Sequence, residues 1–111
     1  MIDKNKALER MRANRAKANN GLVLRTINLM RHQYEHLADV KYALPEIAEG
    51  DFKDSVNYLH QAEYIKLRLR STKDTVRDFA DVDDYTALEA KLTAEGIRLL
   101  GGVKSDGMVD V

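Results

Sequence analysis

The sequence predicts a mainly helical α+β domain, and two kinds of periodicity predict it. Between Leu22 and Ala62, apolar residues recur at spacings of three and four, as they do on the buried side of a helix. After Tyr64 the spacing changes to two, so that apolar and basic residues alternate as in a strand with one buried face. The length of 111 residues suits one domain with a single core.

Residues 1–20 have the composition of a basic helical arm, rich in alanine, lysine and arginine but with a thin apolar stripe. Asn19-Asn20-Gly21 is expected to interrupt the helix, because asparagine and glycine are poor helix formers. A second and stronger helix is then expected from Leu22. Its inward side follows Val23, Ile27, Met30, Tyr34 and Leu37.

A new helical segment is expected near Asp39, and Pro45 predicts either a kink or two short turns, because proline has no amide hydrogen. Gly50 is expected to close this segment, and Asp51 to cap a third helix. The inward side of that helix is Phe52, Val56, Leu59 and Ala62.

Two strands are expected after the third helix. In the first, Ile65, Leu67 and Leu69 alternate with Lys66, Arg68 and Arg70. The second spans Leu88 to Leu92 and can pair antiparallel with the first, which would bring Glu89 close to the arginines as a cross-strand charge pair. The long acidic connection between them, residues 71–85, is expected to hold a helical turn.

Thr93 is expected to cap a short final helix, AEGIRLL, which Gly101-Gly102 ends. The remaining residues are polar and are expected to form a flexible tail. The chain is therefore divided into an arm (1–20), a folded domain (21–100) and a tail (101–111).

Composition excludes several classes of function. Apolar residues make up 44% and charged residues 32%, as in soluble proteins, and there is no long apolar run, so we expect no membrane partner. The N-terminal segment lacks the apolar stretch of a secretory signal, which predicts a cytoplasmic protein. Without cysteine there is no disulfide, thiolate nucleophile or thiolate zinc site. We find no glycine-rich phosphate loop, nucleophile elbow or paired-acid motif, so we expect neither enzymatic activity nor a cofactor.

The stretch HQYEH, residues 32–36, matches the H-x-x-E-H pattern of one class of zinc peptidases. Spacing of four would place His32 and His36 on one face of the second helix. If Met30 marks the centre of the buried stripe, however, both histidines point to solvent, where there is no cleft for a metal. We therefore interpret them as surface residues and expect no metal site.

The formal net charge is zero, but opposite charges are segregated along the chain. The first 25 residues contain seven lysine and arginine side chains against Asp3 and Glu9. A second basic cluster in the first strand precedes an acidic stretch that includes Asp78, Asp81 and Asp84. Binding to nucleic acid would therefore depend on local patches rather than on overall attraction.

From about Gly21 to Leu100 the chain resembles the winged helix-turn-helix superfamily. Two stretches carry the resemblance: DSVNYLHQAEYIKLRLR is similar to a recognition helix that runs into the first wing strand, and EAKLTAEGIRLL is similar to the end of MarR-like and PadR-like regulators. Small phage and prophage proteins also have this arrangement. The resemblance implies a three-helix core, a two-stranded antiparallel wing and a short C-terminal helix.

The resemblance also implies a DNA-binding surface. The outward side of the third helix would enter the major groove, where Asn57 and Gln61 have the amides to read adenine and Lys53 could read guanine or touch phosphate, with Tyr58 beside them. On the wing, phosphate contacts would come from Lys66, Arg68, Arg70 and Lys73. The arm would add Arg10, Arg12 and Arg15, which could instead form an ordinary solvated helix face.

Two functions therefore stay open. The first is a small transcriptional regulator that binds double-stranded DNA, as a homodimer if Leu8 and Met11 provide a subunit contact. The second is a winged-helix module that binds a protein partner, for example as an accessory subunit of a phage or bacterial assembly. This alternative is favoured by Asp51, Asp54 and Glu63, which place negative charge on the helix that would otherwise approach phosphate.

Overall fold

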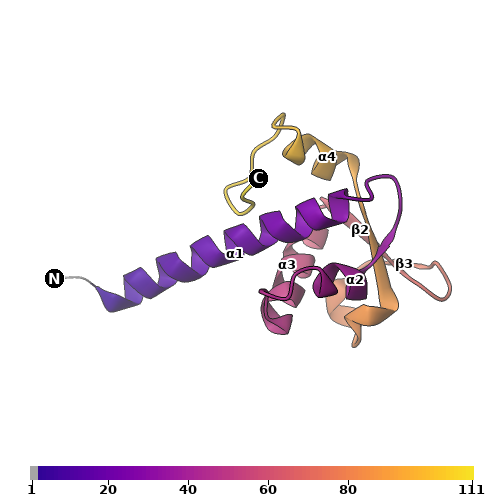
Figure 1. Ribbon diagram of the computed structural model, residues 1–111, viewed down its shortest axis with the longest axis horizontal. Helices are drawn as coiled ribbons and strands as arrows, with labels where there is room; N and C mark the ends of the chain where they lie inside the picture. The colour runs from indigo at the N-terminus through magenta and orange to yellow at the C-terminus, as the bar shows by residue number, and fades with distance from the viewer. Residues whose placement is uncertain (1–2) are drawn as a thin grey trace.

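The computed structural model describes residues 3–111, so residues 1 and 2 of the predicted arm lie outside the described residues. Helices and strands follow one another along the chain in the order α1 (Lys4–Asn28), β1 (Glu35–His36), α2 (Leu37–Tyr42), α3 (Glu49–Gln61), β2 (Ile65–Leu69), β3 (Thr75–Val76), β4 (Leu88–Leu92) and α4 (Ala94–Leu100). The predicted mainly helical α+β class is confirmed (Figure 1).

Helix α1 runs without a break through Asn19-Asn20-Gly21, so the predicted interruption is wrong. The helix begins at Asp3, whose carboxylate accepts hydrogen bonds from the amides of Asn5 and Lys6. Val23 and Ile27 are fully buried, as predicted. The N-terminal half, by contrast, is almost entirely exposed, and it projects from the rest of the protein (Figure 1).

The second half of the predicted core helix is also wrong, because α1 ends at Asn28 and Met30 is exposed. Glu35 and His36 instead form β1, which pairs with β4 at the edge of the sheet. This arrangement lets the Tyr34 ring stack on the Arg68 guanidinium, whose carbon lies 3.6 Å from the ring centroid. HQYEH is therefore not helical. Within residues 3–111, no group of three or more histidine, aspartate or glutamate side chains is placed to hold a metal.

At Pro45 the two short turns predicted as one alternative are present, because α2 ends at Tyr42 and a separate turn precedes α3. Helix α3 starts at Glu49 with Ala48 as its N-cap, so Asp51 is not the cap. Asp51 lies in the first turn instead, where its negative charge interacts favourably with the positive end of the helix dipole. The buried side of the helix contains Phe52, Val56 and Leu59, as predicted.

Both predicted strands are confirmed, and they pair antiparallel with Arg68 opposite Glu89. The sheet is larger than the expected two-stranded wing: it has four antiparallel strands in the order β1-β4-β2-β3. In the acidic connection, β3 pairs with β2, and the predicted helical turn takes the form of two short 3-10 turns, Phe79–Asp81 and Tyr85–Ala87.

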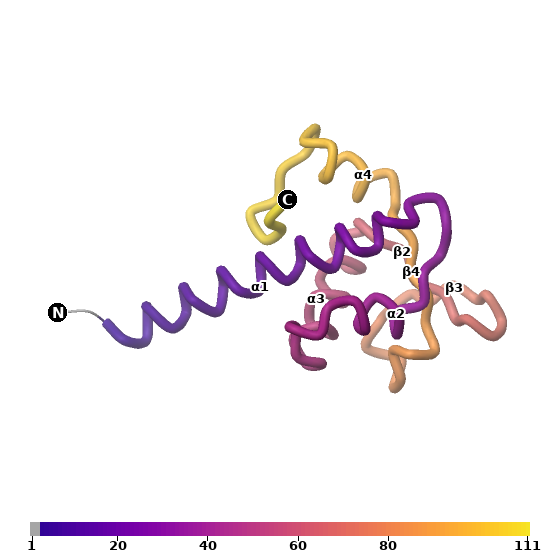
Figure 2. Tube along the Cα trace, viewed as in Figure 1, coloured from indigo at the N-terminus to yellow at the C-terminus, as the bar shows by residue number. Residues whose placement is uncertain are grey.

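Thr93 caps α4 as predicted, since its side chain accepts a hydrogen bond from the Gly96 amide. The last residues differ from the expected flexible tail. They fold back beside the middle of α1 (Figure 2), and Val109 is only 4% exposed within the core. In the described part of the chain, no helix is both long enough and apolar enough to cross a membrane.

Candidate nucleic-acid interface

The predicted arm is an exposed basic surface of the protein. Arg10, Arg12 and Arg15 are all exposed on the projecting half of α1. At 100° per residue, Lys6, Arg10 and Lys17 fall within about 40° of each other on one side of this helix. Among residues 3–111, the ion pairs all lie elsewhere, so the charge of the arm is not neutralised by a salt bridge.

Fewer side chains on the predicted reading face of α3 are available to contact bases than the sequence suggests. Gln61 is exposed and available. Lys53 lies beside the Tyr85 ring, with its ammonium nitrogen 5.9 Å from the ring centroid. The side-chain oxygen of Asn57 is buried and has no hydrogen-bond partner in the described part of the chain. The hydroxyl of Tyr58 donates a hydrogen bond of 2.7 Å to Asp106. Three of the four predicted reading side chains are therefore turned toward other parts of the fold.

Two of the predicted wing cations are held by a buried carboxylate. Glu89 is only 3% exposed, and it accepts hydrogen bonds from Arg68 (2.5 Å) and Lys73 (3.0 Å). Burial raises the pKa of Glu89, but these hydrogen bonds and the two positive charges outweigh burial and lower the pKa below its ordinary value. Arg68 and Lys73 thus neutralise Glu89 and fix the β2–β3 hairpin.

The other two wing cations remain open to solvent. Lys66 is exposed, and Arg70 is exposed with a guanidinium nitrogen 3.2 Å from the carbonyl oxygen of Thr86. The wing therefore offers two unpaired cations rather than the four that the sequence suggests.

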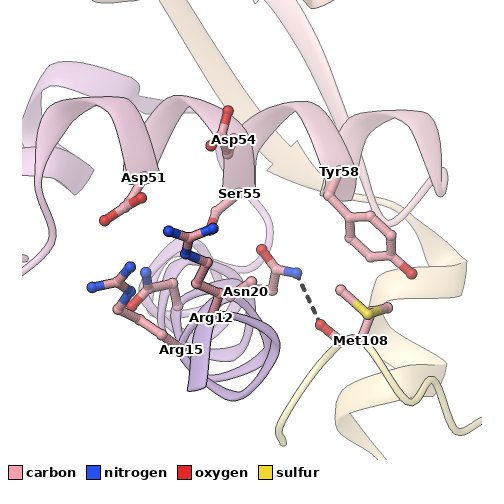
Figure 3. Close-up of a pocket in the computed structure, with 10 residues that line it drawn as sticks. Arg12, Arg15, Asn20, Asp51, Asp54, Ser55, Tyr58 and Met108 are labelled. Atoms are coloured by element: carbon pink, nitrogen blue, oxygen red, sulfur yellow. Dashed lines mark hydrogen bonds between the residues drawn. The ribbon is translucent and has the colours of Figure 1, made fainter. Parts of the chain in front are cut away.

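A groove of about 380 Å³ separates the arm from α3 (Figure 3). Arg12 and Arg15 line it from α1, while Asp51 and Asp54 line it from α3. The opposite charges face one another across the groove, so the acidic start of α3 lies directly beside the base of the arm.

The C-terminal segment, residues 103–110, closes one end of this groove. Its Asp106 carboxylate accepts hydrogen bonds from the hydroxyls of Tyr58 and Tyr64, at 2.7 and 2.6 Å. Burial, followed by the hydrogen bond and the charge of Asp106, raises the pKa of Tyr58 to about 12. The segment thereby covers the Tyr58 side of α3.

Neither Asp106 nor the buried state of Glu89 was predicted from the sequence. Glu89 was expected beside the arginines, but not as a buried residue. A signal for the C-terminal contact was present: a glycine inside a helical pattern often marks a position where another chain segment comes close. Gly21 is such a position, because a Cβ atom there would lie 1.9 Å from the carbonyl oxygen of Asp110.

Comparisons with protein-family models, with curated proteins and with solved structures find no match to this chain.

Proposed function

We propose that the protein is a small DNA-binding protein of the winged helix-turn-helix type. The chain order supports this proposal, since α1, β1, α2 and α3 are followed by β2 and β4, and a short turn joins α2 to α3. In the sheet, β4 lies between β1 and β2, so the two predicted wing strands are adjacent. On this view, β3 and the two 3-10 turns are an insertion within the wing.

The observation that carries the proposal is the exposed arm with its unpaired cations. Arginine and lysine side chains bind DNA mainly through phosphates, because neutralising a phosphate releases condensed counterions. Arg10, Arg12 and Arg15 provide such charges on a preformed helix, so little conformational entropy would be lost on binding. Lys66 and Arg70 on the wing would provide further phosphate contacts.

Base reading by α3 would be limited in this arrangement. Gln61 remains free to contact a base, whereas Asn57 and Lys53 would first have to leave their present surroundings. Asp54 is exposed on the same side and would repel phosphate. We therefore propose that phosphate contacts supply most of the affinity and that α3 contributes modest sequence preference.

Fluorescence anisotropy with a labelled duplex from around the protein's own gene tests the proposal. The Arg10→Ala, Arg12→Ala and Arg15→Ala triple variant keeps a helix-favouring residue at each position. If the three arginines contact phosphates, the slope of log affinity against log salt should fall in magnitude by about 2.7. Between roughly 50 and 200 mM salt, the parent protein should then lose about 40-fold more affinity than the variant.

A double variant with Arg31→Ala and Arg98→Ala serves as the control, because both arginines lie outside the arm and the wing. Its salt slope should match that of the parent protein. Absence of binding at low salt would refute DNA binding altogether, and an unchanged slope in the triple variant would refute the role of the arm.

A second candidate function is docking to a protein partner through α3. It is favoured by the acidic start of this helix, where Glu49, Asp51 and Asp54 replace the positive charge expected of a DNA-reading helix. A co-purified partner that is lost on substitution of Asp54 and Asn57, together with no affinity for DNA, would support this function over the first. A partner that stays bound to those variants would count against it.

A further inference from the structure

Helix α1 has a weak point between its two halves. Asn19, Asn20 and Gly21 are poor helix formers, and no local sequence feature favours a helix across them. The half that precedes them has few tertiary contacts, since residues 8–15 are all exposed. An isolated helix of such length is marginal in water. Contacts from elsewhere in the chain, made by α3 and by the C-terminal segment, therefore support the continuity of α1 through this point.

The C-terminal segment makes its contacts with α1 at this point. The side-chain amide of Asn20 donates a hydrogen bond of 2.8 Å to the Met108 carbonyl oxygen. The Asp110 amide donates to the carbonyl oxygen of Lys17 at 3.1 Å, and its own carbonyl oxygen accepts from Arg25 at 2.6 Å. These bonds join residues on both sides of Gly21, whose lack of a side chain admits the Asp110 carbonyl.

The same segment is attached to the body of the protein. Val109 is buried in the core, and Asp106 accepts hydrogen bonds from Tyr58 on α3 and from Tyr64 at the start of β2. Residues 103–110 are thus held by the rest of the domain and hydrogen-bonded to α1 on both sides of Gly21, so they link the two halves of this helix.

We propose that residues 103–110 act as a splint, which keeps α1 straight across Asn19-Asn20-Gly21 and so sets the direction in which the basic arm projects. Undocking of the splint frees the arm to pivot at these residues while the domain stays folded. The proposal depends on intramolecular contacts alone and holds whether or not the arm binds DNA.

A distance measurement between spin labels tests the direction of the arm. The chain contains no cysteine, so labels can be placed at Asn5→Cys on the arm and at Ser71→Cys on the β2–β3 hairpin, both exposed. Val109→Asp places a charge in the buried anchor and should release the splint. Asp106→Ala removes the other anchor and provides a milder release.

In the otherwise unaltered protein the label distance should have one narrow distribution. Each release variant should broaden this distribution and speed amide hydrogen exchange at residues 18–24 by at least about tenfold, since that helix segment would open locally. Faster exchange at the Asp110 amide verifies the release, because this amide donates a hydrogen bond to the Lys17 carbonyl oxygen on α1 in the docked segment. Unchanged exchange in β4 verifies that the domain is folded.

Two further variants separate the splint from a general loss of stability. Met108→Ala is the matched control, because this side chain is 40% exposed and Met108 bonds to α1 through its carbonyl oxygen. Its distance distribution should stay narrow. Adding Gly21→Ala to Val109→Asp should slow exchange at residues 18–24 again by about fivefold, because alanine is the better helix former.

Broad distances in both release variants, with rescue by Gly21→Ala, would support the splint. A narrow distribution in a variant whose C-terminal amides exchange freely would overturn it, because α1 would then be straight without the segment. Equal acceleration of exchange in α1 and β4 would also overturn it, since the segment would then stabilise the whole domain rather than the weak point.

Discussion

Replacement of Arg68 by alanine tests whether this residue belongs to the fold or to a ligand-binding surface. In the protein, Arg68 donates a hydrogen bond of 2.5 Å to buried Glu89 and covers the ring of Tyr34 at 3.6 Å. A hydrogen bond to a charged group contributes about 1.5–3 kcal/mol, and a partly exposed cation–π contact adds about 0.5–1 kcal/mol. Lys73 still holds Glu89 in the variant, and Arg68 is 29% exposed, which reduces the sum.

We therefore expect Arg68→Ala to lower the free energy of unfolding by about 2 kcal/mol, or Tm by about 10 °C for a domain of this size. Urea unfolding followed by circular dichroism measures the change, with an unaltered m-value if the native state keeps its compactness. Arg70→Ala is the matched control, because Arg70 is exposed directly after the same strand, and its effect should stay within about 0.5 kcal/mol.

A double-mutant cycle with Glu89→Gln isolates the pair itself, and the coupling energy should be about 1–2 kcal/mol. Equal stability of the Arg68 and Arg70 variants, or a coupling energy near zero, would contradict a structural role for Arg68. Arg68 would then be free to act as the phosphate contact that the sequence suggests.

Gly96→Ala should destabilise the protein by about 1–3 kcal/mol in urea unfolding, because the new Cβ would lie 2.3 Å from the Tyr64 carbonyl oxygen. Gly50→Ala, also in a helix but with open space around it, should be neutral or slightly stabilising, and equal effects would contradict this account. Burial raises the pKa of Glu35, so the ionised side chain destabilises the folded state as the pH rises through that pKa. Glu35→Gln should therefore raise the urea midpoint at pH 7, and a lowered midpoint would argue against this destabilisation. For Asp106, burial raises the pKa, but hydrogen bonds outweigh burial and lower the pKa below its ordinary 3.8. The ionised Asp106 therefore stabilises the folded state above pH 3.8, and this stabilisation is lost as the pH falls through the lowered pKa. Between pH 5 and 3, the free energy of unfolding should therefore fall less in the Asp106→Ala variant than in the parent protein. Equal decreases would exclude a stabilising role for the ionised Asp106.

Elements whose signals are local could be predicted from the sequence. The change of period at Tyr64 predicted β2 and β4, and their antiparallel pairing placed Glu89 opposite Arg68. The Thr93 cap and the short turns at Pro45 likewise depend on a few neighbouring residues. Such features are predictable because backbone hydrogen bonding and alternation of side chains act over short separations.

Tertiary contacts, by contrast, set the continuity and the C-terminal end of α1 and the position of the last residues. Asn19-Asn20-Gly21 is helical in the structure, where α3 packs beside α1 and a segment 88 residues later bonds to Asn20. Tyr34 leaves the helical pattern and stacks on Arg68. The tertiary structure also determines which arm and wing cations are paired, since Glu89 forms ion pairs with Arg68 and Lys73 but no carboxylate of residues 3–111 forms an ion pair with Arg10. Contacts between distant segments override weak local preferences, because buried packing and hydrogen bonds outweigh helix propensities of a few tenths of a kcal/mol to about 1 kcal/mol per residue.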